Sequence, residues 1–190
     1  MDLLQSSSLR NCLLGLAVLL ACSAAPSLAA GETIPQVHGH SFAGAAVELP
    51  GALQGKVGIL VIGFSQGARK DVEVWGTRLA STYDDKVGVA YYELPVLASV
   101  PKLLRGFVTG RIDASVAKLG KPHFVVVDEH EAEWRKITHY TAPDDAYVLV
   151  VDGNGSVRWQ TQGLPLETTY TALKQHVDAL TAEIARRPGR

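Results

Sequence analysis

The run from Val57 to Phe64, with the sequence VGILVIGF, is the feature that most constrains how this chain can fold. It is continuously apolar and contains several β-branched residues. A run of this kind is typical of a strand that is buried on both faces of a sheet. It therefore predicts a central strand in the core of the protein.

Strand-like and helix-like patterns alternate around this run. Strands are predicted at 37–48 (a short pair), 57–64, 87–92, 124–128, 146–152 and 157–161. Helices are predicted at 70–83, 100–108, 113–119, 131–137 and 166–184, with Ser65 as a cap before the first of them. Alternation followed by an antiparallel hairpin at Gly153-Asn154-Gly155 indicates an α/β fold. We expect a mixed central sheet with helices on both faces and an N-terminal strand pair.

Residues 1–30 have the pattern of a signal peptide. Arg10 precedes an apolar run from Cys12 to Ala25, and small residues near Ala29 and Ala30 suit a signal peptidase. The apolar run has about 14 residues, short of the roughly 20 that a membrane-spanning helix needs. The remainder, 31–190, has the usual length of a single domain.

A second processing route is open for the same segment. Leu19-Leu20-Ala21-Cys22 resembles the lipobox of bacterial lipoproteins, in which the cysteine is lipidated. Lipidation of Cys22 would anchor the protein to a membrane. We therefore expect either a periplasmic or secreted protein or a membrane-anchored lipoprotein.

Cysteine and charge exclude several classes of function. The two cysteines, Cys12 and Cys22, both lie in the predicted leader, so the domain must fold without disulfides. The formal net charge is −1, which gives no indication of a nucleic-acid partner.

Three segments in this order resemble the thioredoxin-like superfamily, especially its exported branch of peroxiredoxins and periplasmic thiol reductases. They are the segment 49–56 leading into the central strand, Phe64 followed by a loop and a helix, and Tyr147 to Arg158 with the sequence YVLVVDGNGSVR. The resemblance implies a thioredoxin-like fold over 31–190, with the old active-site position at the loop after Phe64.

The chain departs from that family at both redox determinants. The C-x-x-C motif would fall at Arg69 to Val72, where the sequence is RKDV, and the cis-proline would fall at Ala146. Thiol–disulfide chemistry needs a thiolate, and none is available here. We expect no thiol oxidoreductase or peroxidase activity.

A fainter resemblance links the chain to the mitochondrial ATP synthase assembly-factor family, which is thioredoxin-like and lacks the motif. It rests on Gly63-Phe64-Ser65 before the helix and on Trp75 within it. This resemblance implies a chaperone-like role in the assembly of a membrane complex rather than an enzymatic one.

The loop after Phe64 is the candidate binding site. Backbone N–H groups and two cations at a helix N-terminus suit an anion or a carboxylate, although cations there oppose the helix dipole. The candidate residues are Ser65, Gln66, Gly67, Arg69, Lys70, Asp145 and Ala146. We expect a protein partner in the cell envelope, or a small ligand, at this corner, with no catalytic residue and no cofactor. A degenerate loop without a ligand is the alternative.

Three other groups of residues admit functional and ordinary interpretations. Basic residues in 101–121 beside an apolar helix face could contact a membrane or a partner, but we expect that helix to pack on the sheet. His38 and His40 have strand spacing that a metal could use, but we expect no metal there. Asp144 and Asp145 could lie opposite Arg69. A cysteine-independent enzyme or metal-binding protein of the periplasm remains the alternative function.

Overall fold

The computed structural model describes residues 31–186, so the predicted leader with Cys22 lies outside the described residues. The strands are β1 (Val37–His40), β2 (Ala46–Leu49), β3 (Val57–Gly63), β4 (Val89–Pro95), β5 (Ala146–Val151) and β6 (Val157–Gln162). The helices are α1 (Arg69–Tyr83), α2 (Lys102–Ser115), α3 (Glu131–Ile137) and α4 (Glu167–Ala185), with a 3₁₀ turn at Gly51–Leu53.

Four strands form one mixed sheet in the order β4-β3-β5-β6. The central strand β3 is parallel to β4 and antiparallel to β5, and β5 continues into β6 as an antiparallel hairpin. Strands β1 and β2 form a separate antiparallel pair. The predicted α/β class, mixed sheet and N-terminal strand pair are confirmed.

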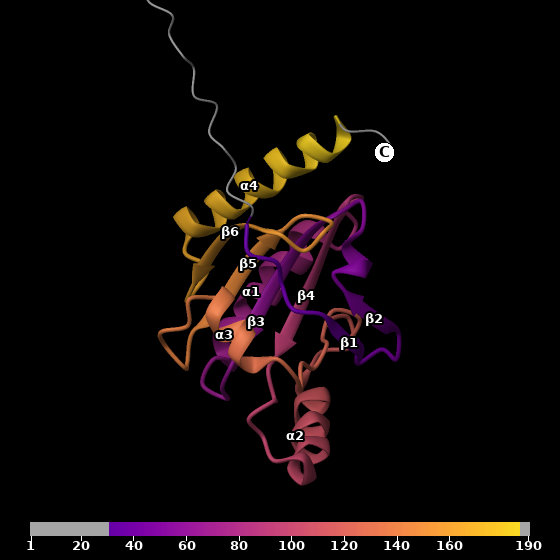
Figure 1. Ribbon diagram of the computed structural model, residues 1–190, viewed down its shortest axis with the longest axis vertical. Helices are drawn as coiled ribbons and strands as arrows, with labels where there is room; N and C mark the ends of the chain where they lie inside the picture. The colour runs from indigo at the N-terminus through magenta and orange to yellow at the C-terminus, as the bar shows by residue number, and fades with distance from the viewer. Residues whose placement is uncertain (1–30, 187–190) are drawn as a thin grey trace, which may run out of the picture.

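Every residue of β3 is buried, and its side chains alternate between two apolar cores. Ile59 and Val61 face α1 and α4, where Trp75 and Leu173 are fully buried. Leu60 on the opposite face packs into the core that includes residues of α3 and of the β1–β2 pair. Figure 1 shows the sheet between these layers. Helices thus cover both faces of the sheet, because each face of β3 is apolar.

Two predicted elements differ in the structure. The segment 124–128 is not a regular strand, because it forms only isolated bridges. Phe124 pairs with Glu93 of β4, Val127 with Val96 just after β4, and Val125 with Ser41. The predicted helix at 113–119 is wrong, since α2 continues to Ser115 and the chain then becomes extended at Val116. Val125 and Val127 are buried as the predicted strand required, but their burial did not determine how the backbone pairs.

The expectation that the helix beginning near Pro101 packs on the sheet is also wrong. No residue of α2 is buried, and Leu103 is 97% exposed. In Figure 1, α2 extends away from the sheet at the end of the molecule opposite α4. The core beside β4 is already filled by Val47 and Leu49 of β2 together with Val125 and Val127, so no apolar face is left for α2 to cover.

Within residues 31–186, no helix is long and apolar enough to span a membrane.

Leu60 is buried in the core and Leu103 is exposed on α2, so their replacement by alanine should change the free energy of unfolding by very different amounts. Leu60→Ala in β3 should lower the free energy of unfolding by about 2–5 kcal/mol, because it leaves a cavity in a closed core. Leu103→Ala on α2 should change it by less than about 0.5 kcal/mol. Urea unfolding of both variants measures this difference, and equal costs would contradict the exposed placement of α2.

Candidate functional site

Ser65 joins the two loops that form the candidate corner, which are residues 65–70 after β3 and residues 144–146 at the start of β5. Its hydroxyl donates a hydrogen bond to Asp144 Oδ1 at 2.8 Å and accepts the backbone N–H groups of Gly67 (2.9 Å) and Ala68 (3.3 Å). Helix α1 begins four residues later, at Arg69, without a side-chain cap. Ser65 therefore organises the loop rather than the helix terminus, which corrects its predicted role as a helix cap.

Gly67 lies against the same carboxylate. A Cβ atom built at Gly67 would be 2.1 Å from Asp144 Oδ1, so any larger residue would push the two loops apart. The loop after β3 and the loop before β5 are thus in direct contact. The sequence analysis considered Asp144 and Asp145 opposite Arg69, whereas in the structure Asp144 contacts Ser65 and Gly67.

Asp145 lies beside Asp71 in the first turn of α1. Burial, and then the negative charge of Asp145, raise the pKa of the Asp71 carboxyl. The charge of Lys70 and a hydrogen bond from the Ala146 backbone oppose that rise. Among the described residues, no ion pair joins Arg69 to Asp144 or Asp145. The carboxylates therefore face Ser65 and Asp71, not the cation that the sequence suggested.

The remaining candidate residues divide into exposed and buried ones. Gln66, Arg69 and Lys70 are exposed on the rim of the corner. Ala146 is fully buried as the first residue of β5, where it pairs with Gly63. Ala146 therefore lies behind the corner and supports it, while the three exposed residues can reach a partner.

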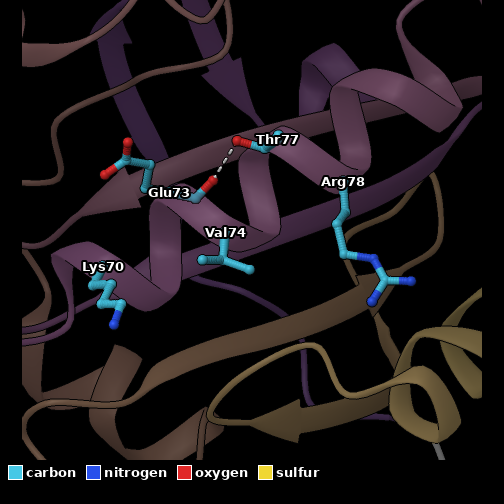
Figure 2. Close-up of a pocket in the computed structure, with 5 residues that line it drawn as sticks. All are labelled: Lys70, Glu73, Val74, Thr77 and Arg78. Carbon is cyan, nitrogen blue, oxygen red and sulfur yellow. Dashed lines mark hydrogen bonds between the residues drawn. The ribbon is translucent and has the colours of Figure 1, made fainter.

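Lys70 also lines one end of an open hollow of about 370 Å³ on the outer side of α1. Figure 2 shows Lys70, Val74 and Arg78 projecting from one side of the helix, while Glu73 points away from them. The Arg78 guanidinium is held by the Pro165 carbonyl at 2.7 Å and by Glu167 at 2.9 Å. The hollow is open to solvent, so it does not enclose a small molecule.

The loop between β6 and α4 adds apolar surface that the sequence analysis did not assign to the site. Leu164 is 46% exposed and Leu166 is 64% exposed. Their loop is fastened to α1 by the Trp75 indole N–H, which donates to the Gly163 carbonyl at 2.7 Å. The sequence assigned Leu166 to the apolar stripe of the last helix, and no local pattern marks it as exposed.

Aromatic side chains support the corner from behind. The ring of Phe64 contacts the rings of Tyr140 and Tyr147 edge to face, at centroid distances of 5.0 and 5.6 Å. The Tyr147 hydroxyl accepts the N–H groups of Thr141 and Ala142 and donates to the Ala142 carbonyl. These contacts hold the loop that leads to Asp144 against the sheet.

Histidine and carboxylate groups give no metal centre in the described part of the chain. His38 and His40 are exposed on β1. No group of three or more histidine, cysteine, aspartate or glutamate side chains in residues 31–186 could hold a metal ion.

The comparisons with solved structures bear on the fold. A protein of Chlorobium tepidum, provisionally named thiol:disulfide interchange protein DsbE, is 18% identical over 82% of this chain and 99% of its own, with a TM-score of 0.57. An uncharacterized conserved protein of Geobacillus kaustophilus is 19% identical over 84% of each chain, also with a TM-score of 0.57. The thioredoxin domain of a thiol-disulfide oxidoreductase from Bacteroides vulgatus is 17% identical over 80% and 99%, with a TM-score of 0.50.

This chain has a thioredoxin-like fold. At these identities the likeness is one of structure alone, and comparison with protein families and with curated proteins finds no match. The predicted superfamily fold is confirmed.

The structure describes the segment where the family resemblance predicts the C-x-x-C motif. Residues Arg69 to Val72 form the first turn of α1, and Val72 is buried beneath it. A helix N-terminus normally stabilises a thiolate at this place. Here the same place presents two exposed cations and no sulfur.

A buried carboxyl group on β4 was missed in the sequence. Glu93 is 5% exposed, and a Cβ atom built at Gly76 of α1 would be 2.4 Å from its Oε1 atom. Burial, and then the charge of Glu73, raise the pKa of Glu93 to about 8. The predicted strand at 87–92 ended one residue before Glu93, whereas β4 continues to Pro95, so the sequence analysis did not place this carboxyl group in the sheet.

Glu93 should make the stability of the protein fall as the pH rises. A carboxyl group whose pKa is higher in the folded state stabilises that state below its unfolded pKa, and this contribution is lost as the pH approaches about 8. Glu93→Gln should therefore gain stability relative to the wild type, by on the order of 3 kcal/mol between pH 5 and 8.5.

Urea unfolding of the wild type, Glu93→Gln and Glu73→Gln across this pH range provides the measurement. Glu73 is exposed on α1 and its charge is the smaller cause of the raised pKa, so Glu73→Gln should reduce the pH dependence only in part, whereas Glu93→Gln should remove it. A difference between wild type and Glu93→Gln that stays constant with pH would show that Glu93 is ionised normally.

Proposed function

We propose that this chain is an exported, redox-inactive thioredoxin-like protein that binds a protein partner at the corner formed by the loops 65–70 and 144–146. The observation that carries the proposal is the corner itself. It keeps its two loops in contact through Ser65 and Asp144, at 2.8 Å, while the thiol position holds Arg69 and Lys70. A structured surface loop that carries no thiol is suited to binding rather than to thiol–disulfide exchange.

The chemistry of the partner follows from the exposed groups. Arg69 and Lys70 offer positive charge, and Leu164 and Leu166 offer apolar surface that is fastened to α1. An extended or helical segment with carboxylates beside apolar side chains would complement both. A small ligand is less suited, because the hollow beside Lys70 is open, whereas small-molecule sites are concave and bury most of the ligand surface.

The setting of this function is part of the same proposal. The predicted leader favours the periplasm or a secreted form, and lipidation of Cys22 would instead anchor the protein. The resemblance to the ATP synthase assembly factors favours a partner that is a component of a membrane complex. The proposed role is that of an assembly factor or adaptor in the cell envelope.

An enzyme that works without sulfur is the alternative from another class. Its acids would be Asp71, Asp144 and Asp145, and the raised pKa of Asp71 beside Asp145 is the observation that favours it. Ser65 is hydrogen-bonded to a carboxylate rather than to a base such as histidine, so it is not arranged as a nucleophile. A metal ion bound to the purified protein, or an activity lost in Asp145→Ala, would support this alternative.

Replacement of the two rim cations should weaken partner binding. Arg69→Ala combined with Lys70→Ala should lower the recovery of the partner from native envelopes by roughly tenfold, because each exposed charge contributes up to about 1 kcal/mol. The matched control, Lys56→Ala with Lys174→Ala, removes the same charge elsewhere and should have little effect.

Site-specific photo-crosslinking tests contact directly. A photoreactive residue at position 70 or 166 should crosslink to the same envelope protein, and one at the exposed Gln175 of α4 should not. Mass spectrometry identifies the product and the mature N-terminus. Equal recovery in the charge variants, together with no crosslink at either position, would remove the corner as the binding site.

A further inference from the structure

Helix α2 presents its apolar face to solvent. Leu103 is 97% exposed, Phe107 66% and Leu104 53%. With 3.6 residues per turn these three side chains fall on one side of the helix. The other side carries Val108 and Ile112, which are only half-buried. The orientation is opposite to that of an ordinary surface helix, whose apolar stripe faces the core.

Exposing this apolar face to water costs free energy when the protein has no partner. A helix of 14 residues is only marginally stable in water without packing, and Gly106 and Gly110 weaken it further. None of its residues is buried. A contiguous exposed apolar patch of this kind marks an interaction site. The helix therefore needs a covering surface.

The charges around α2 show which kind of surface fits. Lys102, Arg111 and Lys118 are exposed and form no ion pair with any described residue. The nearby acids are already engaged, since Asp113 pairs with Lys121 at 2.7 Å and Asp128 pairs with Arg105 at 3.5 Å. The free charge beside the apolar face is thus positive, which favours an anionic surface and disfavours a second copy of this chain.

The position of α2 suits a flat surface. The helix projects from one end of the molecule, away from the sheet and from α4 (Figure 1). The loop that follows it adds Leu119, which is 85% exposed, next to Lys118. A projecting helix with adjacent basic and apolar residues can reach a bilayer without the rest of the domain entering it.

We propose that α2 binds to the interface of an anionic lipid bilayer. Leu103, Leu104 and Phe107 would enter the boundary of the acyl chains, and Lys102 and Lys118 would lie among the phosphate groups. Arg111 lies on the apolar side, and its long side chain can extend to the same depth as the phosphates. This surface is separate from the corner, so the proposal does not depend on the proposed partner.

Vesicle flotation with residues 31–190 tests the proposal without the leader or a lipid anchor. All the buried core side chains of the described chain lie between residues 34 and 180, so this form is expected to fold. It should bind vesicles of equal parts phosphatidylglycerol and phosphatidylcholine at low salt, and bind pure phosphatidylcholine at least about tenfold more weakly. High salt should weaken the binding.

Variants locate the contact on α2. Leu103→Ser with Phe107→Ser should reduce vesicle binding at least about tenfold, whereas Val87→Ser, at a residue 95% exposed on another loop, should not. Lys102→Ala with Arg111→Ala should reduce it about tenfold, against little change for Lys56→Ala with Lys174→Ala. Amides of α2 should exchange rapidly with solvent in the free protein and become protected on anionic vesicles.

Three results would overturn the proposal. The first is binding that is absent, or equal on anionic and neutral vesicles. The second is concentration-dependent dimerisation that Leu103→Ser and Phe107→Ser abolish, which would assign the face to a second copy. The third is binding to native envelope vesicles that protease treatment of those vesicles removes, which would assign it to a protein partner.

Discussion

The burial of β3 on both faces is the constraint on which the rest of the structure depends. All seven of its residues are buried, so each neighbouring layer exists because an apolar face must be covered. Helices α1 and α4 cover one face, and α3 with the β1–β2 pair covers the other. The strand ends at Gly63, which brings the loop with Ser65 to the edge where β5 begins. The position of the corner is thus a consequence of the core.

The corner and α2 differ in how far the rest of the chain satisfies their exposed groups. At the corner, backbone donors and a carboxylate satisfy one another through Ser65, so what remains exposed is charge and two leucines. On α2 nothing within the described chain covers the apolar face. The corner and the apolar face of α2 are separate surfaces, so contacts made at one do not depend on contacts made at the other.

The sequence predicted those elements whose pattern records burial directly. The apolar run at β3 and the stripe of α4 from Tyr170 to Leu180 place side chains against the core, and the structure confirms both. The hairpin follows instead from the turn residues Gly153 to Gly155, and it is also confirmed. Periodicity states that α2 has an apolar face but not whether that face points inward. The contact between Ser65 and Asp144 joins residues 79 positions apart. No local pattern encodes such a pairing, nor the burial of Glu93 against Gly76.

Tyr147 has a wider consequence for how this surface can change. Its ring contacts Phe64, and its hydroxyl is hydrogen-bonded to the 141–142 loop. In the sheet, Tyr147 of β5 pairs with Ile62 of β3. The shape of the corner therefore depends on residues that lie behind its exposed side chains. Ser65, Gly67 and Ala68 take part in the contacts that hold the loop, whereas Gln66, Arg69 and Lys70 are exposed and can be substituted without disturbing that support. The exposed side chains of the corner and the aromatic contacts that support them are thus separate parts of the structure, and variation in the first leaves the second in place.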